Sequence, residues 1–198
     1  MIFDTPKSLA ASITDSLQSA VQKNGKALLI LPGGSSPVPL MQEMAKLDLP
    51  WNEITVTTTD ERDVPLTDPQ SNAGQVKKLL GVDPLWLCDK NAESCLEFPA
   101  TLTILGMGMD AHFASLFPGY PMPEGCRIVK IKAPAAPHNR LSLTLETLLD
   151  TQRLILLAPS PEKRALIAEV QAGKQAGVPL ESLLHAAKEK LEIWAFDV

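Results

Sequence analysis

Residues 101–119 read TLTILGMGMDAHFASLFPG, and this stretch decides the fold. It begins with an apolar, β-branched run at 101–105, a pattern typical of a strand that is buried on both faces. The strand leads directly into GMG at 106–108, where glycine permits backbone angles that other residues avoid. Asp110 and His112 follow at once. Ligands of open α/β sheets bind beyond the carboxyl ends of the strands, so this loop is the first candidate for an active site.

Strand and helix patterns alternate on both sides of this central strand. Helices are indicated by apolar residues at helical spacing, by caps such as Asp4 or Thr5 and Ser71, and by stops such as Gly25 and Gly81. The alternation predicts an α/β fold: a doubly wound, mostly parallel, Rossmann-like sheet with helices on both faces, in one domain over residues 1–198. Strands are expected at residues 27–31, 51–59, 85–88, 127–131, 141–145, 153–158 and 192–196, and helices at 6–24, 37–46, 71–80, 160–172 and 180–190, while 148–151 is too short to assign.

The composition narrows the class of protein. The chain has 198 residues, of which 45% are hydrophobic and 21% charged, as in ordinary globular proteins. A net charge of −5 argues against a nucleic-acid-binding surface but leaves room for a small anionic substrate held by local cations. Cys88, Cys95 and Cys126 show no CxxC spacing, so we expect free thiols in a reducing cytosol. No run has membrane length and no signal-peptide pattern opens the chain, so the expected location is cytoplasmic.

Two polar loops besides the His112 loop follow expected strands. The first is GGSS at 33–36, before an expected helix, where free backbone N–H groups and two hydroxyls favour an anion such as phosphate. An ordinary serine cap explains this loop equally well, and neither a P-loop nor a GxGxxG pattern is present to indicate a nucleotide. The second loop is DER at 60–62. Arg62 there could bind an oxyanion, Asp60 could act as a base or orient another group, and the alternative is a solvated loop.

Imidazole and cations complete the candidate chemistry. An unperturbed imidazole exchanges protons near neutral pH, so His112 can serve as a general base, although a histidine after a glycine turn is often only a hydrogen-bonding residue. Arg140 precedes an apolar run, and Lys163 lies in the first turn of a helix, where the helix dipole disfavours a cation unless an anion binds nearby. We expect neither His138 nor His185 to be catalytic, and no spacing of Cys and His predicts a metal site.

Taken together, these motifs resemble those of the 6-phosphogluconolactonases, within the glucosamine-6-phosphate isomerase/6-phosphogluconolactonase superfamily. The resemblance runs nearly end to end and depends on the order and spacing of several motifs. It is carried by LPGGSSP at 31–37, DERDVP at 60–65 with Ser71-Asn72 after it, and GMGMDAHFASLFPG at 106–119, with weaker marks in NRLSLTLETLL at 139–149 and SPEKRALI at 160–167.

The resemblance implies hydrolysis of 6-phospho-D-glucono-1,5-lactone without a metal or organic cofactor, by a monomer or homodimer that binds neither nucleic acid nor membrane. It implies that His112 is the general base, that Gly34, Ser35, Arg140 and Lys163 face the phosphate, and that Asp60 and Arg62 line the sugar pocket. In the mechanism that we expect from these residues, Asp110 or Asp60 orients the imidazole and Arg62 is a candidate donor to the oxyanion. The expected catalytic residues are thus His112, Asp110 and Asp60, and the expected substrate- and phosphate-binding residues are Gly33, Gly34, Ser35, Ser36, Arg62, Asn72, Arg140 and Lys163.

Two features separate the branches of the superfamily, and one departs from the pattern. The deaminase/isomerase branch usually has an aromatic residue where Arg62 stands and an Asn-Glu-Pro ending after its histidine turn, whereas this chain has SLFP at 115–118. An amino-sugar-phosphate deaminase and a non-catalytic sugar-phosphate sensor are the alternative functions. The family typically has glycine where Ala111 stands, and a positive φ there would strain alanine by about 1–2 kcal/mol.

Overall fold

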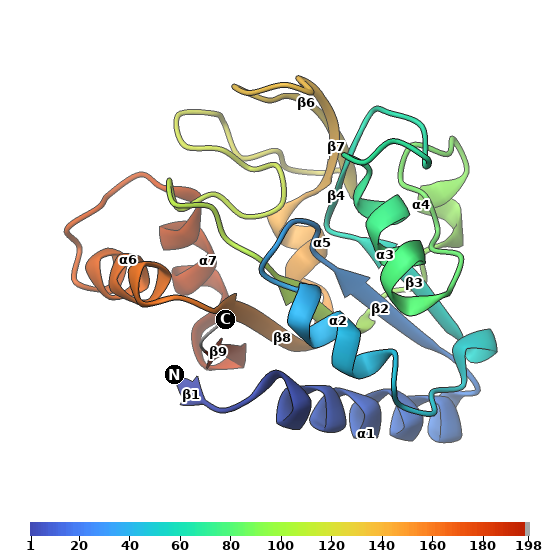
Figure 1. Ribbon diagram of the computed structural model, residues 1–198. Coiled ribbons are helices and arrows are strands. Elements are labelled where there is room, and N and C mark those ends of the chain that lie inside the picture. The colour runs from blue at the N-terminus through green and yellow to red at the C-terminus, as the bar shows by residue number, and fades with distance from the viewer. Residues whose placement is uncertain (197–198) are drawn as a thin grey trace.

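The computed structural model describes residues 1–196, in which strands and helices alternate along most of the chain (Figure 1). The elements run in chain order as β1 (Ile2–Phe3), α1 (Pro6–Asn24), β2 (Ala27–Leu31), α2 (Val38–Met44), β3 (Ile54–Thr58), β4 (Asp60–Arg62), α3 (Asn72–Leu80), α4 (Ala92–Cys95), β5 (Ala100–Leu105), β6 (Ile128–Lys132), β7 (Asn139–Leu143), α5 (Leu145–Leu149), β8 (Thr151–Ala158), α6 (Pro161–Gln171), α7 (Pro179–Ala187) and β9 (Leu191–Ala195), with 3₁₀ turns at Trp51–Glu53 and Lys188–Lys190.

A six-stranded sheet forms the centre of the fold. Its strand order is β1-β9-β8-β5-β2-β3, and each neighbouring pair is parallel. From β2 the chain first moves outward to β3 and then returns to β5 on the other side of β2. The strand order therefore reverses between β2 and β5, which is where ligands bind in doubly wound sheets. The predicted fold class is confirmed.

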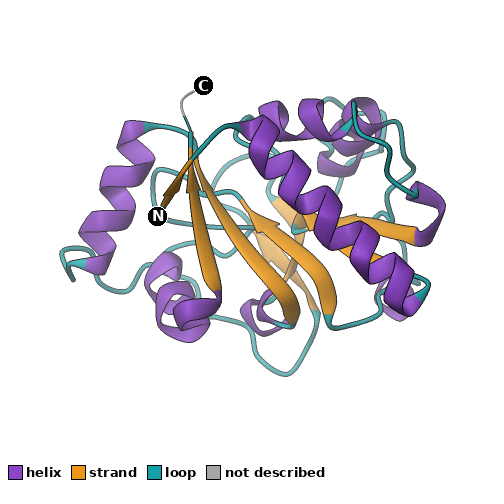
Figure 2. Cartoon of the chain, turned by 90° about the horizontal axis from the view of Figure 1, so that it is seen from below, coloured by secondary structure: helices purple, strands orange, loops and turns teal. Residues whose placement is uncertain are grey.

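Helices cover both faces of this sheet (Figure 2). Because side chains alternate along a strand, β2 sends Leu29 and Leu31 to one face and Leu28 and Ile30 to the other. The first face packs against α1, α2 and α3, and the second against α5, α6, α7 and the loop that follows β5. This two-sided burial explains why the strand sequences are continuously apolar rather than alternating.

The predicted caps hold the long helices in place. Thr5 Oγ1 accepts a hydrogen bond from the Ser8 N–H at 3.1 Å at the start of α1, and Ser71 Oγ accepts one from the Gly74 N–H at 2.9 Å at the start of α3. Gly25 and Gly81 end these helices in the left-handed conformation, as expected of helix stops.

A second, three-stranded antiparallel sheet in the order β4-β7-β6 rises above the main sheet (Figure 1). The sequence did not predict this sheet: DER at 60–62 was expected to be a loop, and 127–131 and 141–145 were expected in a mostly parallel sheet. In the structure, Asp60 pairs with Ser142, and Arg62 pairs with Arg140. The small sheet therefore places two arginines side by side.

Other differences are local. The expected strand at 85–88 is only a single bridge between Leu85 and Thr57, and the expected strand at 51–59 is a 3₁₀ turn followed by β3. Residues 145–149 form α5 because the Thr144 side chain caps a helix there. Neither β1 nor α4 was predicted; β1 is two residues long and pairs with β9, which comes from the far end of the sequence.

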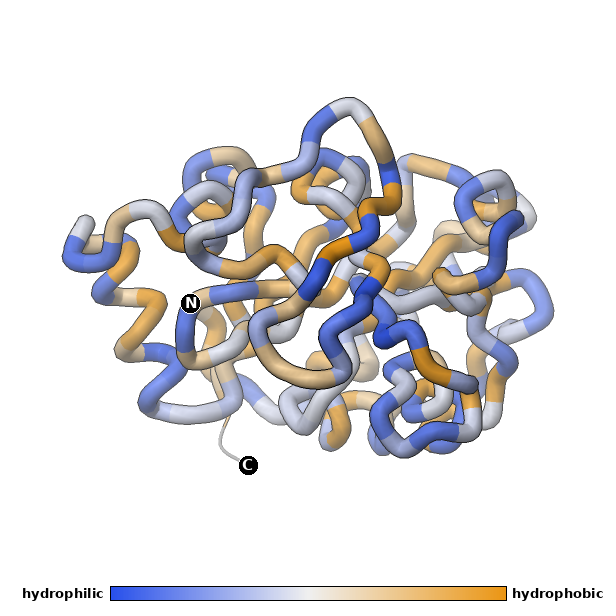
Figure 3. The backbone as a smooth tube through the Cα atoms, turned by 90° about the horizontal axis from the view of Figure 1, so that it is seen from above, coloured by the Kyte–Doolittle hydropathy of each residue, from blue (hydrophilic) through white to orange (hydrophobic). Residues whose placement is uncertain are grey.

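Hydrophilic and hydrophobic residues alternate along much of the chain (Figure 3). Of the helices formed by residues 1–196, none combines the length and the hydropathy needed to cross a membrane.

Candidate active site

A cavity of about 210 Å³ lies beyond the carboxyl ends of β2 and β5, at the point where the strand order reverses. All the residues predicted for the site line this cavity, except Asp110, which contacts His112. The structure therefore brings together residues from six separate segments of the sequence. The predicted residues in the lining are Gly33, Gly34, Ser35, Ser36, Asp60, Arg62, Asn72, His112, Arg140 and Lys163.

The His112 ring is held by Asp110. Nδ1 of His112 lies 2.5 Å from Asp110 Oδ1, which leaves Nε2 to meet water or substrate. Partial burial opposes ionisation of Asp110, yet the hydrogen bond and charge attraction from His112 together bring the pKa of that carboxyl below its ordinary value. Gly108 lies directly against this pair, and a Cβ there would come within 2.3 Å of the imidazole. Position 108 therefore requires glycine, because any Cβ there would clash with the His112 ring.

The turn that presents His112 contains two alanines with positive φ, Ala111 at 62° and Ala114 at 50°. Hydrogen bonds hold the first of them from both sides: the Ala111 N–H donates to Gly108 O at 3.1 Å, and the Leu180 N–H at the start of α7 donates to Ala111 O at 3.1 Å. The left-handed conformation considered for Ala111 from the sequence is therefore present. Its strain persists because the surrounding contacts fix the turn.

Replacing Ala111 with glycine is expected to leave the free energy of unfolding within about 1 kcal/mol of the wild-type value. Relief of about 1–2 kcal/mol of left-handed strain opposes the loss of a buried methyl, about 0.8 kcal/mol, and the greater chain entropy of glycine, about 0.5–1 kcal/mol. Urea denaturation measures the change.

The control is Ala10→Gly, in the middle of α1, where the methyl is also fully buried but no strain is relieved. This variant should lose about 2 kcal/mol. An equal loss in Ala111→Gly would show that the turn stores no strain.

Three cations face the cavity. Arg62 and Arg140 are cross-strand partners on β4 and β7, an arrangement in which like charges repel. Burial lowers the pKa of Arg140, and the charge of Arg62 lowers it further, against the opposing effect of Asp60. Lys163 Nζ donates to Ser36 Oγ at 2.6 Å, and burial lowers the pKa of Lys163 as well. In Arg140 and Lys163, therefore, burial has removed water from the charged group, as expected where an anion binds.

Asp60 is buried, and its carboxylate is occupied by protein groups. Oδ1 accepts hydrogen bonds from Thr59 Oγ1 at 3.1 Å and Asn72 Nδ2 at 3.2 Å. Oδ2 accepts one from Ser115 Oγ at 2.6 Å and lies 4.0 Å from the Arg140 guanidinium. Of the two carboxylates considered for orienting His112, Asp110 therefore occupies that position, and Asp60 is placed to hold neighbouring side chains.

The glycine loop at 33–36 differs in one respect from its expected role. The Gly34 N–H donates to Gln75 Oε1 at 3.0 Å, and Gln75 Nε2 donates back to Gly34 O at 2.8 Å. The Gly34 N–H is therefore already bonded within the protein, and the Ser35 and Ser36 hydroxyls are among the polar groups that the loop offers to a ligand. Gly33 lies against Asn72, and a Cβ at Gly33 would come within 1.9 Å of Asn72 Oδ1.

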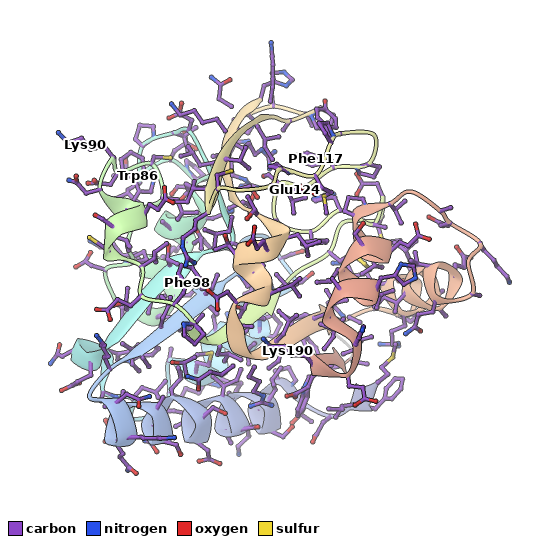
Figure 4. The ribbon with its side chains drawn as sticks, turned by 180° about the vertical axis from the view of Figure 1, so that it is seen from behind. Trp86, Lys90, Phe98, Phe117, Glu124 and Lys190 are labelled. Carbon is purple, nitrogen blue, oxygen red and sulfur yellow. The ribbon has the colours of Figure 1, made fainter. Side chains whose placement is uncertain are left out.

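Sequence reasoning missed three residues next to the site. Phe117, in the loop beside the small sheet (Figure 4), has its ring centroid 4.7 Å from that of His112 and 5.9 Å from the Arg140 guanidinium carbon. Glu61 is fully buried and accepts hydrogen bonds from three backbone N–H groups and Ser71 Oγ, which ties β4 to the start of α3. Burial raises the pKa of Glu61, although those bonds act against it. Ser115 is the third, and the sequence signal for it is its place within the motif at 106–119.

Cys88 lies behind the site, with its Sγ 3.8 Å from Arg62 O. Burial raises the pKa of this thiol from 9.0 to about 12, and the nearby carboxylates of Glu61 and Asp63 act in the same direction. Cys95 and Cys126 are free and exposed.

Cys88 is expected to resist alkylation. The thiolate is the reactive form, so a shift of this size lowers the reactive fraction by about 10³-fold. Iodoacetamide at mildly alkaline pH should modify Cys95 and Cys126 first, as followed by peptide mass spectrometry. Modification of Cys88 at the rate of the other two in the folded protein would contradict the prediction.

The remaining histidines lie away from the cavity. His138 Nδ1 is hydrogen-bonded to Ala133 O at 2.9 Å, and His185 is on an exposed face of α7. Within the described part of the chain, no three His, Cys, Asp or Glu side chains gather in a way that could hold a metal ion.

Comparisons with known proteins show which family the chain is similar to. The relative from Caulobacter vibrioides, a 6-phosphogluconolactonase, is 33% identical over 213 residues, covering 94% of this chain and 90% of the relative. The crystal structure of a 6-phosphogluconolactonase from Shewanella baltica has a TM-score of 0.88 at 26% identity and covers 99% of this chain and 97% of that one. The structure of a monomeric glucosamine-6-phosphate deaminase has a TM-score of 0.77 at 17% identity and covers 98% of this chain and 96% of that one. At this identity the likeness shows only that the two proteins have the same fold. A family model described as glucosamine-6-phosphate isomerases/6-phosphogluconolactonase matches residues 4–193, so the chain belongs to that family.

Proposed function

We propose that this protein hydrolyses 6-phospho-D-glucono-1,5-lactone to 6-phospho-D-gluconate, the second step of the oxidative pentose phosphate pathway. The observation that carries the proposal is a single cavity in which a carboxylate-bound imidazole faces three cationic side chains. A lactone with a phosphate at its far end needs both halves of this site. The likeness to 6-phosphogluconolactonases supports the same choice within the family.

The cations bind the phosphate end of the substrate. Arg62, Arg140 and Lys163 in the lining outnumber the single carboxylate there, Asp60, so the cavity has a surplus of positive charge. A phosphate monoester carries a charge of about −1.5 to −2 near neutral pH, which this surplus neutralises. Arg140 and Lys163 hold the phosphate with the hydroxyls of Ser35 and Ser36, and charge-assisted bonds of this kind are the strong ones.

His112 carries out the proton transfers. With Nδ1 bonded to Asp110, Nε2 takes a proton from water as the resulting hydroxide attacks C1 of the lactone. The tetrahedral intermediate then collapses, the bond from C1 to the ring oxygen breaks, and the imidazolium returns its proton to that oxygen. Arg62 stabilises the developing oxyanion: it lines the cavity, and its Nε is buried without a hydrogen-bond partner among residues 1–196.

The direct test is acid release from freshly generated phosphogluconolactone. Purified protein should accelerate it well above the spontaneous rate, in proportion to enzyme concentration. A parallel incubation with glucosamine 6-phosphate and an ammonia assay tests the deaminase alternative. Tight binding of the phosphorylated sugar without turnover of either substrate would indicate a sensor and contradict the proposal.

The remaining expectations follow from this function. We propose that residues 1–198 act as one sugar-phosphate hydrolase domain, located in the cytoplasm with the other enzymes of sugar-phosphate metabolism. A monomer or homodimer stays the predicted state, and size-exclusion chromatography with light scattering measures it.

A further inference from the structure

The two halves of the site come from different sheets. His112 lies in the loop after β5 of the main sheet, whereas Arg62 and Arg140 lie on β4 and β7 of the small sheet. Catalysis on a substrate held at its phosphate requires a fixed distance between these halves. Ordinary sheet pairing does not provide it, because β5 is hydrogen-bonded to β2 and β8 only within the main sheet.

Ser115 joins the two halves. It lies in the same turn as His112, three residues further on, and is fully buried. Its Oγ–H donates to Asp60 Oδ2 at 2.6 Å, and its backbone N–H donates to Ser142 Oγ at 3.1 Å. Asp60 and Ser142 are themselves cross-strand partners on β4 and β7. Both hydrogen-bond donors of Ser115 therefore bond to one cross-strand pair of the small sheet, Asp60 and Ser142.

This cross-strand pair also determines where Arg140 lies. Asp60 Oδ2, the oxygen that accepts the Ser115 hydrogen bond, is the one 4.0 Å from the Arg140 guanidinium. Arg140 has only 10% of its side chain exposed and follows Asn139 in β7, two residues before Ser142. A single carboxylate oxygen is thus shared between the loop of the general base and the phosphate-binding arginine.

We propose that Ser115 is a positioning residue that sets the distance from His112 to the phosphate-binding cations through Asp60 and Ser142. The proposal rests on the proposed lactonase function and adds a residue to its machinery. Ser115 does not line the cavity, so it acts without touching the substrate.

The expected effect is on turnover. In Ser115→Ala the His112 loop loses the hydrogen bond from the Ser115 hydroxyl to Asp60 and keeps only the backbone bond to Ser142 Oγ, while the cations and hydroxyls that bind the phosphate stay in place. A misplacement of about 1 Å in a catalytic group can cost about 10²-fold in rate. We therefore expect kcat to fall by about 10²-fold, and both KM and the dissociation constant of the product 6-phosphogluconate to change by less than about threefold.

Three variants test this. Ser115→Ala removes the hydroxyl that donates to Asp60. Ser115→Cys keeps a side chain of similar shape with only a weak donor, so it should retain intermediate activity. Ser142→Ala removes the acceptor of the Ser115 N–H on the small sheet without changing the loop. The matched control is Thr151→Val, which removes a buried hydroxyl bonded to Ala100 O at the amino ends of β8 and β5, away from the cavity, and should keep wild-type kcat. Calorimetry with 6-phosphogluconate and thermal unfolding accompany the kinetics of each variant.

The outcomes separate the two proposals. A wild-type protein with no lactonase activity overturns the proposed function and this inference with it. An active wild type whose Ser115→Ala variant stays within about twofold in kcat overturns the positioning role alone. A Ser115→Ala variant that loses affinity for the product as strongly as it loses turnover also overturns the positioning role, since that pattern indicates general disruption of the site. If Ser115→Ala fails to fold, Ser115→Cys and Ser142→Ala test the positioning role by the same criteria.

Discussion

Replacing His112 with alanine is expected to lower kcat by about 10²–10⁴-fold, the contribution of a positioned general base, with little change in KM. In the proposed mechanism the imidazole takes part in the proton transfers, whereas Arg140 and Lys163 hold the phosphate. Removal of the ring therefore costs transition-state stabilisation and leaves ground-state binding largely intact. Initial rates of acid release over a range of phosphogluconolactone concentrations measure both parameters.

His185→Ala is the control for this variant, because His185 is exposed on α7 and lies outside the cavity. It should retain wild-type kcat and KM. Near wild-type kcat in His112→Ala would remove the imidazole from the mechanism. A large rise in KM with unchanged kcat would instead assign His112 to binding.

Replacing Arg140 with alanine should act mainly on KM, raising it by about 10–100-fold. A hydrogen bond to a charged group is worth about 1.5–3 kcal/mol, and the bond proposed here would join a mostly buried guanidinium to the phosphate. The guanidinium has only 10% of its side chain exposed, and burial has already lowered its pKa. Steady-state kinetics with phosphogluconolactone measure the change.

The unphosphorylated lactone of gluconate separates binding of the phosphate from binding of the sugar. Wild-type protein should prefer the phosphorylated lactone strongly, and Arg140→Ala should lose much of that preference because its rate on the unphosphorylated compound hardly changes. Arg127→Ala, which removes an arginine paired with Asp150 outside the cavity, is the matched control. Equal losses on both lactones would mean that Arg140 supports the fold rather than the phosphate.

Much of the main sheet could be predicted because its signals are local. Apolar runs such as ALLIL at 27–31 are short, continuous and ended by proline and glycine, and Ser71 and Gly81 delimit a helix by their own backbone chemistry. Such features depend on a few neighbouring residues and survive without knowledge of the rest of the chain.

The small sheet depends on distant residues. A three-residue strand of Asp, Glu and Arg has no hydrophobic pattern, and it becomes β4 only by pairing with β7, some eighty residues later in the chain. Two residues at the N-terminus become β1 in the same way, by pairing with β9. Strand propensity reflects packing against neighbours more than any intrinsic preference, so the residues of β4 and β1 do not by themselves indicate a strand.

The sequence by itself determined the class of fold, the loop that carries the imidazole and the identity of the cations, because residue type and spacing are enough to show them. Tertiary structure alone decided which partners each carboxylate contacts. It bonded Asp60 to Ser115, Asn72 and Arg140 and left the nearby Asp110 to hold His112, although both carboxylates had been candidates for the same task. The physical reason is that a carboxylate bonds to whichever donors folding brings within about 3 Å, and those donors come from segments that are far apart in the chain.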